Sequence, residues 1–220
     1  MKDGPASATS PDPGAPKPSE IDSAKGRQIL DGARKVFLAD GFDGASMNDI
    51  ARVAGVSKGT IYSYFASKEA LFEALVREDR RVQAEQLGAY DDHQGPVAEV
   101  MRRMGFGLMK VMLDPAHVAQ TRTVIAAAAK FPGIGRVFYE AGPQFGQDQF
   151  SAWLRRKVDE GQLTIDDFDG AAAQFLNLVQ GVHFRQMLFC FSPRPSDAAI
   201  ERTVDDAVAV FLTVYGRKSG

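Results

Sequence analysis

The fold is decided by one stretch of the chain, Ser46–Phe65, which reads SMNDIARVAGVSKGTIYSYF. Ser46 and Asp49 have the spacing of a capping box, so a short helix is expected to begin there. Gly55 then permits a tight turn, and Ser57 can cap a second short helix. Two short capped helices joined by a glycine turn are typical of a helix-turn-helix, whose second helix enters the major groove of DNA.

The beginning of the second short helix is suited to contact with DNA. Lys58, Gly59 and Thr60 form its leading turn. Gly59 is a poor helix former, and close approach to DNA is one reason for a glycine there. The N–H groups that follow the caps Ser46 and Ser57 can receive phosphate oxygens, as helix N-termini do.

Further helices are expected on both sides of this motif. Ser19–Asp22 has the form of another capping box, and apolar residues over Ile29–Phe37 recur at helical spacing before a stop at Gly41. A longer helix is expected to begin at Ser67. Residues 1–18 hold five of the eleven prolines and no large apolar residue except Met1, which predicts a disordered tail.

The rest of the chain also reads as helical, and we predict an all-α fold. Helices are expected from Pro96 and from Asp114, with a break at 131–133. Gly142-Pro143 should kink or interrupt the helix that follows. The stretch Asp166–Phe191 is apolar almost all round, which predicts burial on more than one side. Ser196 begins a last helix.

Composition and charge exclude several classes of protein. The chain has 220 residues and a net charge of −2, and no apolar run approaches the roughly 20 residues that span a bilayer. Between Glu20 and Lys68, seven Lys and Arg stand against six Asp and Glu, so charge alone decides nothing about DNA. The single cysteine, Cys190, lies in an apolar run and is expected to be buried and inert. We expect a cytoplasmic protein.

Two enzyme-like signals carry little weight. Gly55–Gly59 matches G-x-S-x-G, the nucleophile elbow of hydrolases, but that motif needs a preceding strand, and a helix is expected here. The histidines His93, His117 and His183 show no metal-ligand spacing with Cys190. We therefore expect no enzyme activity, no metal and no cofactor. A binding module that has lost its affinity for DNA is the remaining alternative.

With these residues in view, Ser46–Leu71 and the helix before it closely resemble the DNA-binding signature of the TetR family, over about residues 24–72. The resemblance implies contacts with double-stranded DNA by these residues: Ser46, Ser57, Lys58, Gly59, Thr60, Tyr62, Tyr64 and Lys68. Among them Ser46, Tyr62 and Lys68 would touch phosphates. Tyr64 stands where histidine is common. Alternatively, Lys68 is a solvated charge, and Tyr62 packs its ring in the core while presenting its hydroxyl.

The resemblance also implies a domain organisation. A helix-turn-helix domain would occupy 19–66, and an effector-binding and dimerisation domain 67–220, beginning with a linking helix over 67–87. The C-terminal half resembles the effector domains of AcrR- and AefR-like members, in which the last two long helices form a four-helix dimer interface. The residues expected at a homodimer interface are Phe175, Val179, Val182, Val204, Val208 and Phe211.

An effector pocket is expected among the middle helices, lined by adaptable and aromatic side chains. The candidates are Met101, Met104, Phe106, Met109, Met112, Phe145, Trp153 and His183. Plain core packing is the alternative for this stripe. The function expected is a repressor that binds a palindromic operator and is released by a small apolar or amphipathic effector. Activation is the alternative polarity.

Overall fold

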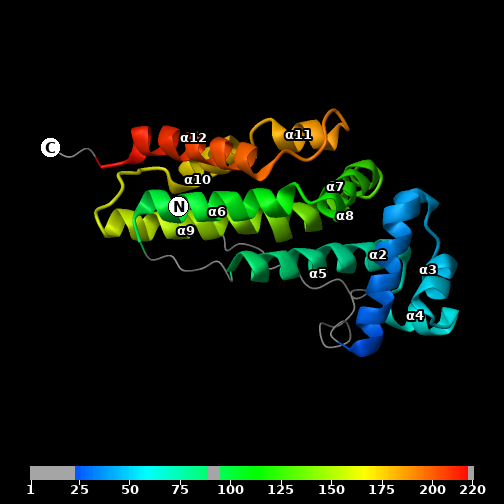
Figure 1. Ribbon diagram of the computed structural model, residues 1–220. Coiled ribbons are helices and arrows are strands. Elements are labelled where there is room, and N and C mark those ends of the chain that lie inside the picture. Colours follow the sequence, from blue (N-terminus) through cyan, green and yellow to red (C-terminus); the bar gives the residue numbers. More distant parts are fainter. Residues whose placement is uncertain (1–22, 89–94, 218–220) are drawn as a thin grey trace, which may run out of the picture. The chain divides into compact units, whose positions relative to one another are not determined.

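The computed structural model describes residues 23–88 and 95–217, the side chains of 83–88 excepted. The predicted tail over 1–18, the capping box at Ser19–Asp22 and His93 lie outside the described residues. Within the described part the chain is helical, with one isolated bridge between Leu163 and Gly216 and no strand (Figure 1). The predicted all-α fold is confirmed. No helix in that part is long and apolar enough to cross a membrane.

The chain divides into two compact units, the first ending at Leu75 and the second beginning at Val76. The first unit therefore extends beyond residue 66, the predicted end of the helix-turn-helix domain. The division falls inside one helix, α5 (Lys68–Gly88), which contributes its first two turns to the first unit and the rest to the second.

The first unit is a small bundle of α2 (Ala24–Gly44), α3 (Met47–Ala54), α4 (Lys58–Tyr64) and the start of α5. Helix α2 starts at Ser23, whose Oγ accepts a hydrogen bond from Gly26 N at 2.9 Å. Its helical geometry is interrupted at Gly41, whose φ of 69° lies in the left-handed region that glycine tolerates. Three mutually contacting rings centre the core: Phe37, Phe42 and Phe72.

The second unit contains the remaining helices. They are α6 (Val97–Met112), α7 (Pro115–Ala128), α8 (Pro132–Tyr139), the π-helical segment η1 (Glu140–Gln144), α9 (Phe145–Asp159), α10 (Phe168–Gln180), α11 (His183–Leu188) and α12 (Asp197–Tyr215). Pro143 distorts its helix as predicted, through a π-helical turn rather than a stop. Gly181, at a φ of 52°, divides the apolar stretch that we expected to be one element into α10 and α11.

Aromatic rings from three helices centre the core of the second unit. Phe150 stacks on Trp153 at 5.4 Å and on Phe175 at 4.9 Å between ring centroids. Phe211 of α12 meets Phe175 edge-on at 5.6 Å. Such pairs add to the free energy gained by burying the rings themselves. Helices α9, α10 and α12 are thereby held in one cluster, against which α6 packs.

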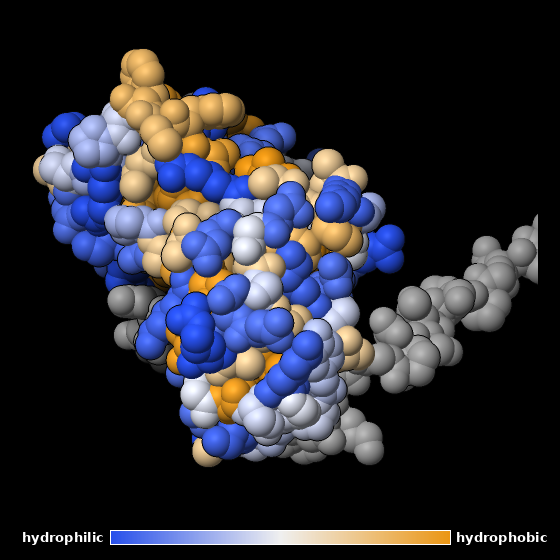
Figure 2. All heavy atoms as spheres, turned by 90° about the vertical axis from the view of Figure 1, so that its right-hand side faces the viewer, coloured by the Kyte–Doolittle hydropathy of each residue, from blue (hydrophilic) through white to orange (hydrophobic). Residues whose placement is uncertain are grey.

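The turn after α11 corrects the prediction for Cys190. Its thiol is exposed, and its φ of 56° places the backbone in the left-handed region, because α11 ends at Leu188 and the chain reverses there. Arg122 of α7 holds this end of α11 by donating to the carbonyls of Met187 and Leu188. The rings flanking Cys190 are among the exposed hydrophobic groups of the unit; orange spheres in Figure 2 show where apolar side chains reach the surface on the face drawn.

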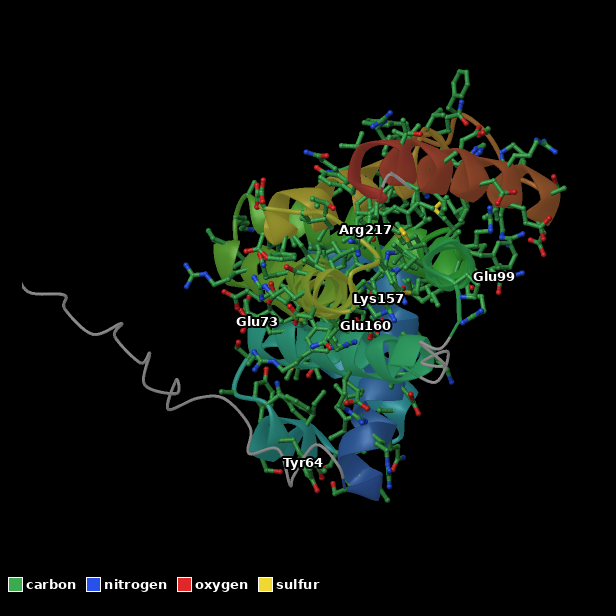
Figure 3. All side chains as sticks on the ribbon, turned by 90° about the vertical axis from the view of Figure 1, so that its left-hand side faces the viewer. Tyr64, Glu73, Glu99, Lys157, Glu160 and Arg217 are labelled. Carbon is green, nitrogen blue, oxygen red and sulfur yellow. The ribbon has the colours of Figure 1, made fainter. Side chains whose placement is uncertain are left out.

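The C-terminal end of α12 is tied to the turn between α9 and α10. Arg217 Nη1 donates to the carbonyl of Gly161 at 3.0 Å, and Thr164 N donates to the carbonyl of Tyr215 at 2.9 Å. Next to this turn, Lys157 Nζ donates to Glu160 Oε2 at 2.8 Å; both side chains are labelled in Figure 3.

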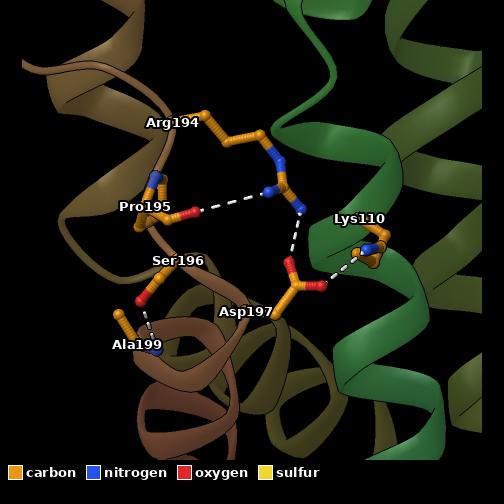
Figure 4. A network of polar contacts seen from close by, with 6 residues as sticks. All are labelled: Lys110, Arg194, Pro195, Ser196, Asp197 and Ala199. Atoms are coloured by element: carbon orange, nitrogen blue, oxygen red, sulfur yellow. Dashed lines mark hydrogen bonds and ion pairs between the residues drawn. The ribbon is translucent and has the colours of Figure 1, made fainter.

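The N-terminal end of α12 is tied to α6. Ser196 caps the helix by accepting from Ala199 N, and Asp197 accepts from Lys110 Nζ at 3.0 Å and from Arg194 Nη2 at 2.9 Å (Figure 4). These two cations hold the pKa of Asp197 below its usual range. Helix α12 is therefore fixed at both ends and presents its outer face in a defined position.

Candidate DNA-binding interface

The α3–turn–α4 segment has the local geometry that the sequence predicts. Ser46 Oγ accepts from Asp49 N at 3.1 Å, and Ser57 Oγ accepts from Thr60 N at 3.0 Å, so both predicted caps are present. Gly55, with a φ of 64°, ends α3 in the left-handed conformation that is common at the C-terminal ends of helices. The G-x-S-x-G match therefore lies on a turn between two helices, where the strand of a nucleophile elbow is missing.

Helix α4 is divided sharply into a buried and an exposed face. Ile61 is buried against the bundle, and Phe65 is buried immediately after the helix. Lys58 and Gly59 are exposed at the start of the helix, and the ring of Tyr62 is 45% exposed. The ring of Tyr62 is therefore not part of the core, whereas that of Phe65 is, and the contact of Tyr62 with phosphate stays a prediction. The surface made by the exposed Lys58, Gly59 and Tyr62 and the half-buried Thr60 is here called the α4 face.

Ser46 is engaged more fully than the sequence suggested. Besides its capping bond, its hydroxyl donates to Asp49 Oδ2 at 2.6 Å, and Arg52 donates to the other carboxylate oxygen at 2.9 Å. These two hydrogen bonds, that of Ser46 first, hold the pKa of Asp49 below its usual range. A phosphate arriving at the start of α3 would therefore compete with the Asp49 carboxylate for the Ser46 hydroxyl.

Tyr64 and Lys68 bind parts of their own chain. The half-buried Tyr64, labelled in Figure 3, accepts a hydrogen bond from Ser23 Oγ at 3.4 Å, which places it at the start of α2. Lys68 Nζ donates to the carbonyls of Phe42 at 2.7 Å and Ala45 at 3.0 Å, and lies 4.6 Å from the centroid of the Phe42 ring. Lys68 is thus a tie between α5 and the α2–α3 connection and is not a solvated charge. No sequence pattern indicates that tie, because its partners lie 23 and 26 positions away in the chain.

The candidate effector residues of the second unit differ in their burial. Met101, Met109 and Trp153 are buried in its hydrophobic core, which is the plain alternative, whereas Phe145 is exposed. The others are half-buried: Met104, Phe106, Met112 and His183. His183 Nε2 lies 3.1 Å from Thr203 Oγ1 of α12. Five of the eight, all but Met112, Phe145 and His183, belong to one hydrophobic core or pack against it, and the effector pocket stays a prediction.

The residues predicted for the dimer interface lie mostly in the hydrophobic core of the second unit. Five of the six are buried inside the subunit, so their side chains cannot meet a partner: Phe175, Val179, Val204, Val208 and Phe211. Only Val182 is exposed. The reason is that α10 and α12 carry two apolar stripes, and the stripe chosen from the sequence is the one that packs on α6 and α9. The exposed apolar residues of α10, of α12 and of the turn before α11 are here called the outer stripe: Leu178, Val182, Val210 and Val214.

The fold and the α4 face define a helix-turn-helix protein with a separate helical domain. Comparison with known families agrees with this class. The family described as bacterial regulatory proteins, tetR family, matches residues 29–75, and that described as AefR-like transcriptional repressor, C-terminal domain, matches residues 99–217. The chain belongs to the TetR family of transcriptional regulators, and the resemblance of its C-terminal half to AefR-like members is confirmed.

Individual relatives agree. The repressor AcnR of Corynebacterium glutamicum is 33% identical over 145 residues, which cover 64% of this chain and 69% of AcnR. The repressor Rv1474c of Mycobacterium tuberculosis is 42% identical over 90 residues, 40% of this chain; the match spans about half of that relative, 46%.

Solved structures of the family are similar over most of the chain. A TetR-family regulator from Mesorhizobium loti has a TM-score of 0.83 at 28% identity, covering 88% of this chain and 97% of that one. The flavonoid-responsive regulator FrrA has a TM-score of 0.75 at 29% identity, covering 89% and 98%.

Proposed function

We propose that this protein is a dimeric, ligand-responsive transcriptional repressor that binds a palindromic operator in the cytoplasm. The observation that carries the proposal is the α4 face. A short helix, capped by Ser57 and anchored by Ile61, exposes Lys58, Gly59 and Tyr62 together. A recognition helix needs this combination: a buried side that fixes it, and a small-sided first turn that can enter the major groove.

Dimerisation is supported by the outer stripe. Val210 and Val214 lie one turn apart on α12, and their side chains are 51% and 64% exposed. Leu178 of α10 and Val182, the residue just before α11, are exposed apolar residues as well. Exposed apolar surface of this kind marks interaction sites, and a two-fold dimer presents two recognition helices to the two halves of a palindrome. We therefore propose a second copy of the chain as the partner.

The effector is proposed to be a small apolar or amphipathic molecule held in the second unit. The half-buried Met104, Phe106 and Met112 lie on α6, beside the core, and offer adaptable and aromatic surface. The similar regulator FrrA is flavonoid-responsive. Flavonoids are aromatic, amphipathic molecules. Such a molecule releases DNA only if it binds the DNA-free state more tightly.

The proposal is tested by mobility shift on the DNA that flanks the protein's own gene, over a series of salt concentrations. Lys58→Ala and Tyr62→Phe should weaken binding, and Lys58→Ala should reduce the slope of log affinity against log salt by roughly 0.9 if Lys58 neutralises one phosphate. The matched control is Lys35→Ala, which removes an exposed lysine of α2. Absence of a shift at low salt, or equal effects of Lys58→Ala and Lys35→Ala, would contradict the proposal.

The same titration decides the role of Lys68. Lys68→Met removes a cation whose Nζ already donates to two carbonyls. If Lys68 acts only as this tie, affinity falls while the salt slope stays at the wild-type value. A slope reduced as in Lys58→Ala would instead assign Lys68 a phosphate contact.

A further inference from the structure

A buried arginine on α5 lies at the meeting point of three other elements of the second unit. The side chain of Arg80 is only 5% exposed. Its Nη1 is 3.1 Å from His117 Nδ1, and its Nη2 donates to Gln120 Oε1 at 2.5 Å; both partners are on α7. Its guanidinium carbon lies 4.4 Å from the centroid of the Phe138 ring on α8.

The fourth contact is with η1, at a glycine. A Cβ atom added to Gly142 would lie 2.9 Å from Arg80 Cδ, closer than carbon atoms in proteins approach. Gly142 belongs to the π-helical segment Glu140–Gln144, and π-helical turns inside helices are frequent at functional sites. The stem of Arg80 is therefore confined by η1, and its head is held by α7 and α8.

The electrostatics show why this arrangement has few alternatives. Burial lowers the pKa of Arg80 to about 10, so the guanidinium is still charged at neutral pH. Burial and the charge of Arg80 lower the pKa of His117 to about 4, so its imidazole is neutral and Nδ1 can accept from Arg80. A buried charge is tolerated only while its hydrogen bonds are made. Displacement of α7, α8 or η1 must therefore be followed by Arg80 or become costly.

We infer that Arg80 is the positioning residue through which α7, α8 and η1 set the state of α5, and thereby the affinity for DNA. The inference rests on the proposed function and concerns its regulation. Helix α5 is continuous from Lys68 to Gly88, and Lys68 in its first turn is tied to the carbonyls that precede α3. A packed interface of this kind has discrete arrangements and does not deform continuously, so a change at one end of α5 is passed on.

The test uses two substitutions of the same kind. Gly142→Ala pushes Arg80 out of place without altering any charged group, whereas Gly146→Ala adds the same methyl group where no atom lies within 4 Å. Affinity is measured on a DNA fragment that the wild-type protein has selected from a random pool. Gly142→Ala should weaken binding roughly tenfold and Gly146→Ala less than about twofold, because the competent state becomes a minor one in the first variant only.

A double-mutant cycle checks that the effect passes through the arginine. Arg80→Met and His117→Leu remove the two sides of one contact, so each should weaken DNA binding and the double variant should be no weaker than the worse single one. All variants are compared at a temperature where circular dichroism shows them folded. Additive effects in the cycle, or wild-type affinity of Gly142→Ala, would overturn the inference. The conservative Arg80→Lys replaces Arg80→Met if that variant does not fold.

Hydrogen exchange separates this inference from the proposed function. Amide protection of residues 68–75, measured without DNA, should fall in Gly142→Ala and stay unchanged in Gly146→Ala. If the wild-type protein selects no DNA, the proposed function fails. A fall in protection would then retain the coupling through Arg80, and unchanged protection would reject it as well.

Discussion

The two units hold their functional candidates in opposite environments. In the first unit, the α4 face lies in the open, and its geometry is fixed by bonds between residues three or four apart, such as Ser57 to Thr60. In the second unit, Arg80 is buried and meets groups 37 to 62 positions away in the chain, from His117 to Gly142. The first arrangement suits a surface that must meet DNA unchanged. The second suits a packed interface in which the helices around Arg80 move together.

The largest effect is expected where the second unit buries a ring that we had assigned to the dimer interface. Phe175→Ala should lower the free energy of unfolding of this unit by about 3–5 kcal/mol, because it leaves a cavity beside Phe150 and Phe211. The single tryptophan of the chain, Trp153, lies in the same cluster, so its fluorescence in a urea titration reports on this unit.

The matched variant is Val214→Ala, which shortens an exposed side chain of the outer stripe. It should leave the urea midpoint of the folded subunit nearly unchanged and weaken self-association in sedimentation. The reverse pattern, in which Phe175→Ala dissociates the protein and keeps its stability, would restore the original assignment.

The next effect is the contribution of His117, in the second unit, to the loss of stability on acidification. The folded protein keeps His117 neutral down to a pKa of about 4, whereas an unfolded chain binds the proton near 6.5. Between these values the unfolded state binds more protons, so stability falls as the pH is lowered, by about 3 kcal/mol at the lower end. The measurement is the urea midpoint of Trp153 fluorescence between pH 7 and 4.

His117→Gln supplies the comparison, since an amide can still accept from Arg80 and does not titrate in this window. Protonation of carboxylates lowers the stability of both proteins to the same extent. The difference between their pH curves is therefore the contribution of the His117 imidazole. Parallel pH curves for the two would show that His117 is not held neutral.

A smaller effect distinguishes two glycines of the first unit. A Cβ on Gly32 would lie 2.6 Å from Ala54 Cβ and 2.8 Å from its Cα, so Gly32→Ala must separate α2 from α3, at a cost of about 1–3 kcal/mol. Gly59→Ala meets only Ser57 Oγ at 3.8 Å and should stabilise α4 by about 0.5–1 kcal/mol. The stability changes of the two variants are measured by thermal unfolding and by hydrogen exchange of residues 24–75.

DNA binding adds a second readout to this pair. Because Gly59 lies on the α4 face, Gly59→Ala should weaken DNA binding although the unit is more stable. Gly32→Ala should lower both the stability of the unit and its affinity for DNA. A Gly59→Ala protein that binds DNA as the wild type does would remove Gly59 from the contact surface.

The contrast between the units also explains what the sequence could predict. Both caps of the helix-turn-helix and the stop at Gly55 depend on neighbours in the sequence, and they were found at the predicted residues. The two stripes of α12 have the same period, so periodicity alone could not show that Val208 faces inward and Val210 outward. Arg80 carried no signal, since an arginine in a polar helix is ordinarily exposed. Its burial depends on partners brought together by the fold.

The smallest effect tests how far the local rules extend into function. Ser57→Ala removes the cap of α4 and should cost about 1 kcal/mol of stability, whereas Ser63→Ala, on the exposed part of the same helix, removes only a bond to the carbonyl of Thr60. If the first turn of α4 receives a phosphate, Ser57→Ala should weaken DNA binding by more than its stability loss explains, because fraying misplaces the N–H groups. Equal affinities of the two variants under conditions where both are folded would mean that α4 binds DNA through its side chains alone.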